Sequence, residues 1–69
     1  MKIFSERLQK IREERGFSKK EMAEAMEITV RAYYFYEEGQ REPNYDKLVA
    51  LARHLKVSTD YLLGLTDTP

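Results

Sequence analysis

Apolar residues recur at helical spacing along almost the whole chain. Phe4, Leu8 and Ile11 lie three or four positions apart among charged residues, and Gly16 ends the run, which predicts a first helix. The stretch Ser18-Lys19-Lys20-Glu21 then fits a capping box, in which the serine hydroxyl and the glutamate carboxylate bind the free backbone amides of a helix start. A second helix is therefore predicted to begin here.

The second predicted helix is short and gives way near Glu27. Its inner side is formed by Met22, Ala23 and Met26. Thr29 is a good N-cap for a third helix from Val30 to about Glu38, and Gly39 suits the left-handed residue just beyond a helix end. Two short helices joined by a turn of about three residues are typical of a helix-turn-helix unit.

The last third of the chain predicts two further helices. Asn44 is placed to cap a fourth helix, whose apolar stripe consists of Leu48, Leu51, Ala52 and Leu55. Ser58 is placed to cap a last short helix that ends at Gly64. Because no segment alternates like a strand, residues 1–65 are predicted to form a compact, all-α domain of five helices, with residues 66–69 as a polar tail or the start of a linker.

Composition narrows the class of protein. A chain of 69 residues supports one small domain, and the absence of cysteine excludes disulfides and thiolate metal sites. Twelve basic residues balance twelve acidic ones, so any binding to a polyanion must come from the local arrangement of charges. No signal peptide is visible and no stretch approaches the roughly 20 apolar residues that cross a bilayer, which predicts a cytoplasmic protein without a membrane partner.

Residues for catalysis or metal binding are not grouped. The single histidine, His54, has no second ligand type arranged around it, and a surface or boundary role is expected for it. The serines have no neighbouring base and serve better as helix caps, and no glycine-rich phosphate loop is present. We therefore expect no enzyme activity, no cofactor, no metal and no small-molecule ligand.

Several stretches together carry a resemblance to a known family. In order, they are LQKIREERGFS (residues 8–18), the S-x-x-E-x-A run from Ser18 to Ala23, Tyr36-Glu37-x-Gly39-x-Arg41-x-Pro43, Leu48-x-x-Leu51-Ala52, and VSTDYLLG (residues 57–64). Over nearly its whole length the chain resembles the phage-repressor and Cro type of helix-turn-helix DNA-binding domain, the lambda-repressor-like XRE family. Two positions depart from the family pattern. Glu27 stands where the family often has glycine, and Tyr33 stands where it usually buries Ile or Val.

Helical spacing sorts the aromatic residues of the third helix onto two faces. Tyr33 and Tyr36 are predicted to point inward. The outward candidates are Val30, Arg31, Tyr34 and Phe35. The resemblance implies that this outward side enters the major groove of DNA, which makes these four residues the candidates for base readout.

Each outward residue offers a specific chemistry to DNA. Arg31 suits two hydrogen bonds to guanine O6 and N7, whereas Val30 and Phe35 suit contact with a thymine methyl group. Tyr34 has a hydroxyl for a phosphate. In the alternative interpretation, Tyr34 and Phe35 cover the edge of the core or anchor a partner protein, and Arg31 is a solvated charge.

Contacts to the DNA backbone are expected around the third helix. Amides at a helix start favour a phosphate oxygen, and the loop after the third helix resembles the family's second phosphate clamp. The expected phosphate contacts are Ser18, Lys19, Lys20, Thr29, Gln40, Arg41 and Asn44. Glutamates occur in the same stretch, and we expect Glu38 to point away from DNA.

An ion pair is predicted in the core. Arg12 shares the inward stripe of the first helix with Leu8, and Glu37 shares that of the third helix with Tyr33. Buried charges persist only when they are paired, so a salt bridge between Arg12 and Glu37 is predicted. The family resemblance implies the same contact, and the alternative is two unrelated charges at the rim of the core.

A dimer is expected because one short recognition helix covers only a few base pairs. The candidates for its interface are Tyr61, Leu62, Leu63 and Leu65, with closure of the core as their alternative role. The predicted function is a sequence-specific regulator of transcription, a repressor, that binds a palindromic operator on double-stranded DNA as a homodimer. The alternative is a protein-binding module, such as an antitoxin-like partner, in which Tyr34 and Phe35 anchor the interface. Whether the chain is complete or part of a longer repressor stays open.

Overall fold

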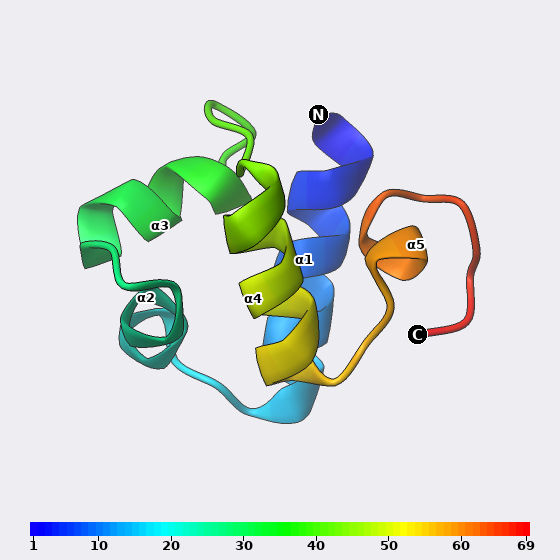
Figure 1. Ribbon diagram of the computed structural model, residues 1–69, viewed down its shortest axis with the longest axis horizontal. Coiled ribbons are helices and arrows are strands. Elements are labelled where there is room, and N and C mark those ends of the chain that lie inside the picture. Colours follow the sequence, from blue (N-terminus) through cyan, green and yellow to red (C-terminus); the bar gives the residue numbers. More distant parts are fainter.

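A computed structural model describes residues 1–69 and contains five helices and no strand (Figure 1). The helices are α1 (Lys2–Arg15), α2 (Lys19–Met26), α3 (Val30–Glu37), α4 (Tyr45–Leu55) and α5 (Thr59–Leu62). The all-α fold predicted from the sequence is confirmed. No helix is both long enough and apolar enough to cross a membrane.

The helices surround a single hydrophobic core. In Figure 1, α1 and α4 occupy the middle of the domain, α2 and α3 lie to one side of them, and α5 lies to the other side. Every helix contributes to the core, whose buried apolar residues are Phe4, Leu8, Ile11, Met22, Ala23, Met26, Tyr33, Tyr36, Leu51, Ala52, Leu55, Tyr61 and Leu62. One consequence is that α3 has an inner face fixed by its two buried tyrosines and an outer face left free.

The predicted N-caps are confirmed. The side-chain oxygens of Ser18, Thr29, Asn44 and Ser58 each accept a hydrogen bond from a backbone amide three residues ahead, at 2.8–3.0 Å. Some helix ends differ from the prediction. Helix α1 begins before Phe4, because the amide of Ser5 already donates to the carbonyl of Met1. Helix α3 ends one residue before Glu38, and α5 ends at Leu62, two residues before Gly64.

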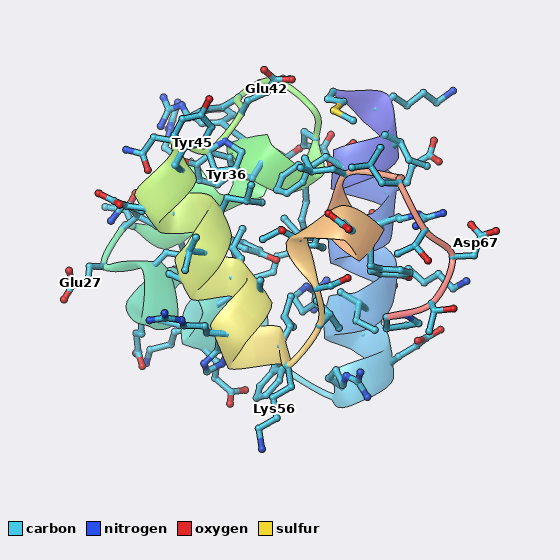
Figure 2. All side chains as sticks on the ribbon, turned by 45° about the vertical axis from the view of Figure 1, so that its right-hand side comes forward. Glu27, Tyr36, Glu42, Tyr45, Lys56 and Asp67 are labelled. Carbon is cyan, nitrogen blue, oxygen red and sulfur yellow. The ribbon has the colours of Figure 1, made fainter.

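Glu27, which stands where the family often has glycine, adopts the left-handed backbone conformation that glycine favours. Its φ is 58° and its ψ is 43°, which lets the chain turn sharply from α2 into α3. Figure 2 shows its carboxylate projecting from the edge of the domain. A side chain at positive φ costs free energy because its Cβ crowds the following carbonyl oxygen.

Replacing Glu27 with glycine is expected to raise the free energy of unfolding by about 0.5–1 kcal/mol, since glycine adopts positive φ without strain but loses more backbone entropy on folding. Urea denaturation measures the change. The matched reverse substitution is Gly16→Ala, because Gly16 has a φ of 77° and no atom within 4 Å of an added Cβ. That variant should be less stable, and a stabilised Gly16→Ala or a destabilised Glu27→Gly would contradict this account.

The polar segment 66–69 folds back against the body of the domain. The guanidinium of Arg7 donates to the carbonyls of Tyr61 and Thr66 and to the carboxylate of Asp67, the last at 2.6 Å. The same guanidinium lies 4.7 Å from the centroid of the Tyr61 ring. Figure 2 shows Asp67 at the outer edge of this segment. Arg7 therefore forms a clasp between α1 and the end of the chain.

Candidate nucleic-acid interface

A buried polar cluster fixes the inner side of α3. Arg12 Nε donates to Glu37 Oε2 at 2.6 Å, and Arg12 Nη2 donates to Glu37 Oε1 at 3.3 Å. The Tyr33 hydroxyl donates to Glu37 Oε2 at 2.5 Å. Tyr33 stands where the family usually has Ile or Val, and this hydrogen bond gives its buried hydroxyl a partner. The structure thus contains the ion pair predicted from the sequence, and both of its residues are buried.

The same cluster joins three parts of the chain. Arg12 Nη1 also donates to the carbonyl of Phe17, just before α2, at 2.9 Å. Hydrogen bonding to Glu37 raises the pKa of Arg12 above its ordinary value, and burial together with the hydrogen bond to Glu37 raises the pKa of Tyr33. The guanidinium therefore remains charged and the phenol remains neutral at pH 7. This arrangement holds α3 against α1 in one orientation.

The outer side of α3 presents the residues predicted for base readout. Val30 is 46% exposed and Tyr34 is 42% exposed, while Arg31 is also exposed. Phe35 is half-buried, so it is less accessible than an outward-facing residue was predicted to be. None of the four side chains is fully buried, so the outer side of α3 is accessible to a partner molecule.

Cations gather on the two outward rings. The Arg31 and Arg41 guanidinium carbons lie 5.8 and 5.4 Å from the centroid of the Phe35 ring, and Lys19 Nζ lies 5.4 Å from that of Tyr34. These distances are within the range of cation–π attraction. Side chains from α2, α3 and the following loop thus bring three cations to these two rings, although the formal net charge of the whole chain is zero.

Three residues predicted to contact phosphate serve as helix caps. Ser18, Thr29 and Asn44 each use a side-chain oxygen to accept a backbone amide. Their remaining donors, two hydroxyl hydrogens and a carboxamide NH₂, are left for a phosphate oxygen. The carboxylate of Glu21 accepts from the Ser18 amide, and these hydrogen bonds to Ser18 lower the pKa of Glu21. One backbone donor at the start of α2 is thereby already taken.

The other predicted phosphate contacts keep their side chains free of hydrogen bonds within the chain. Lys20, Gln40 and Arg41 are exposed, and Lys19 is half-buried with its Nζ over the Tyr34 ring. Glu38 is exposed at the end of α3 and forms no ion pair.

Lys47 positions the turn and was missed by sequence reasoning. Its Nζ donates to the carbonyl of Met26 at 2.5 Å, which joins α4 to the last residue of α2. A signal was present, because Lys47 lies four residues before the buried Leu51 and so shares its face of α4. The last carbonyls of a helix have no amide partner within that helix, and Lys47 supplies a donor to one of them at the end of α2.

His54 has the boundary position that the sequence indicated. It is half-buried and its ring lies 4.6 Å from that of Phe17, at a tilt of 45°. Its Nε2 has no hydrogen-bond partner within the chain. Packing against Phe17 accounts for its place in the fold.

The residues predicted for a dimer interface divide between the core and the surface. Tyr61 and Leu62 are buried in the core and are not available to a partner, which corrects the prediction for these two residues. Leu63 is half-buried and packs against the core, and Leu65 is 75% exposed. The alternative role, closure of the core, therefore applies to Tyr61 and Leu62 and in part to Leu63.

The fold and this surface define a helix-turn-helix domain of the phage-repressor and Cro type. The family model described as "Helix-turn-helix" matches residues 8–62, so the chain belongs to that family. The solution structure of the DNA-binding domain of the P22 C2 repressor superimposes on this chain with a TM-score of 0.83 and 28% sequence identity. The match covers 96% of this chain and 90% of that one. The sequence-based recognition of the family is confirmed.

Curated relatives from Bacillus subtilis extend beyond this chain. It is 40% identical over 67 residues to YobD, named an HTH-type transcriptional regulator, and the match covers 97% of this chain and 60% of that protein. It is 41% identical over 58 residues to the HTH-type transcriptional regulator ImmR, with 84% of this chain and 46% of that protein covered. The chain thus spans about half the length of these relatives.

Proposed function

We propose that this protein is a sequence-specific regulator of transcription, a repressor, that binds double-stranded DNA with α3 in the major groove. The observation that carries the proposal is the outer surface of α3. Arg31 is exposed next to partly exposed apolar side chains. The cation of Lys19 lies on the Tyr34 ring, and that of Arg41 lies on the Phe35 ring. A guanidinium with apolar neighbours fits base edges, and flanking cations fit phosphates.

The similarity to named regulators supports this function. YobD and ImmR carry the description HTH-type transcriptional regulator, and the P22 C2 repressor domain is described as DNA-binding. In this type of domain the second helix of the unit, here α3, reads the major groove. We assign base readout to Val30, Arg31, Tyr34 and Phe35.

We further propose that the protein binds a palindromic operator as a homodimer. Leu65 is 75% exposed, and Leu63 borders an apolar groove of about 170 Å³ between the starts of α1 and α4. Burial of such surface against a second copy is favourable. Two copies related by a twofold axis would meet half-sites about 34 Å apart.

Salt dependence is the first test of the function. If phosphates are neutralised, the logarithm of the binding constant should fall linearly with the logarithm of salt concentration, by about 0.9 for each contacted phosphate. Fluorescence anisotropy with duplexes from a random library measures both the affinity and this slope. A flat salt response, or no binding to any duplex, would favour the protein-binding module instead.

Lys19→Ala is expected to weaken binding to all sequences alike and to reduce the steepness of the salt slope by about 1. The reason is that a lysine near the start of α2 contacts the backbone and reads no base. Lys10→Ala is the matched control, because Lys10 is exposed on α1 beside Tyr61 and Asp67. Equal effects of the two substitutions would exclude Lys19 from the interface.

A protein partner is the second candidate function. The edge-to-face pair of Tyr34 and Phe35, with ring centroids 6.0 Å apart, is the type of aromatic anchor found in protein interfaces. Binding to such a partner would persist at salt concentrations that abolish DNA binding.

A further inference from the structure

The accessible residues of α3 carry few hydrogen-bonding groups. Three residues of this helix are buried, and the accessible ones are Val30, Arg31, Ala32, Tyr34 and Phe35. Arg31 has the only charge among them, and the hydroxyl of Tyr34 is the only neutral polar group. The accessible residues of α3 therefore include neither a carboxamide to pair with adenine nor a carboxylate to accept from the cytosine amino group.

An uncovered apolar strip lies beside Arg31. Val30 and Tyr34 are one helical turn apart, so they are neighbours on the same face. Val30 is not part of the core cluster and leaves 46% of its surface exposed. The Tyr34 ring meets the edge of Phe35 on one side and Lys19 on another, and 42% of this residue is still exposed. The fold therefore leaves nearly half of each of these two residues uncovered.

The chemistry of the major groove offers one apolar group to such a strip. It is the C5 methyl group of a pyrimidine, which thymine carries and cytosine gains when it is methylated at C5. Arg31, adjacent to the strip in sequence and 5.8 Å from the Phe35 ring, is suited to the two acceptors of a guanine.

We propose that the strip formed by Val30 and Tyr34 recognises a pyrimidine C5 methyl group next to a guanine that is bound by Arg31. This inference rests on the proposed DNA-binding function and specifies its preferred sequences. Discrimination then depends on the presence of a methyl group as much as on hydrogen bonds.

Removal of single methyl groups tests the inference. Duplexes selected from a random library are resynthesised with one thymine at a time replaced by deoxyuridine, which deletes the methyl group and keeps every hydrogen-bonding atom. We expect affinity to fall about fourfold at a thymine next to a guanine, since burial of one such group contributes about 0.8 kcal/mol. Unchanged affinity at every position would overturn the proposal.

A second set of duplexes separates the two sources of the methyl group. At the sensitive position the T·A pair is replaced by C·G or by 5-methylcytosine·G. The methylated cytosine should bind about fourfold more tightly than the unmethylated one, by the same methyl contribution. Equal binding of the two would mean that a group other than the methyl is read there, and this would overturn the proposal.

Variants assign the effect to the strip. Val30→Ala and Tyr34→Ala should each reduce the affinity difference between thymine and uracil duplexes. Val49→Ala is the matched control, because Val49 lies on α4 and is 41% exposed, close to the exposure of Val30. A full thymine preference in both strip variants would overturn the assignment. Circular dichroism checks that each variant is folded.

The salt titration keeps the two hypotheses distinct. A protein that binds duplexes with a steep salt slope and shows no methyl preference would refute the methyl inference alone. A protein that binds no duplex would refute the proposed function itself.

Discussion

Replacement of Glu37 by alanine is expected to lower the free energy of unfolding by about 3–5 kcal/mol, because it leaves the buried charge of Arg12 without its partner. The Tyr33 hydroxyl loses its acceptor at the same time. A domain of this size is stable by only about 5–15 kcal/mol. The variant should therefore be partly unfolded at moderate temperature, as measured by urea denaturation followed by circular dichroism.

Two further variants make the result specific. Glu38→Ala removes the neighbouring glutamate, which is exposed, and should change stability by less than about 0.5 kcal/mol. The double variant Arg12→Met with Glu37→Leu removes both charges and should recover much of the lost stability, because an apolar pair avoids the cost of a lone buried charge. A loss below 1 kcal/mol in Glu37→Ala would show that the ion pair does not anchor α3.

Substitution of Arg31 by alanine is expected to remove about 1–3 kcal/mol of discrimination at one base pair of each half-site, which is roughly a fivefold to 150-fold change. The loss follows from the two hydrogen bonds that a guanidinium gives to guanine O6 and N7. Binding of the selected duplex and of its single-base-pair variants measures the change as an affinity ratio.

The pattern of the loss matters more than its size. Arg31→Ala should lower the affinity for the selected duplex but not for the duplex that is changed at the base pair read by Arg31. Lys19→Ala should lower the affinity for both duplexes. Arg53→Ala is the control, because Arg53 is an exposed arginine near the end of α4. Uniform weakening by Arg31→Ala would assign this residue to the phosphate backbone.

The helix boundaries and caps were predictable because each depends on a few neighbouring residues. The capping box depends only on Ser18, Glu21 and the backbone that joins them. A left-handed residue after a helix depends only on the conformation of its own backbone. The ion pair of Arg12 and Glu37 was predictable for a different reason. Each charge stands on the inward stripe of its own helix, and two opposite charges directed into a small core must meet.

The roles of the last residues were not predictable in the same way. Helix α5 has four residues, about one turn, so its spacing does not distinguish the buried Tyr61 and Leu62 from Leu63 and Leu65. The contacts of Arg7 were missed because two of its three acceptors are backbone carbonyls, which every residue carries. Stacking of Arg41 on Phe35 likewise depends on how the loop after α3 returns.

The clasp of Arg7 also affects the way in which the domain opens. A guanidinium seven residues from the beginning of the chain binds the carbonyls of Tyr61 and Thr66, close to its end. The segment from α5 to Asp67 cannot detach from α1 without breaking these hydrogen bonds and exposing the Arg7 side chain. We therefore expect the middle of α1 and the segment after α5 to open together in hydrogen exchange.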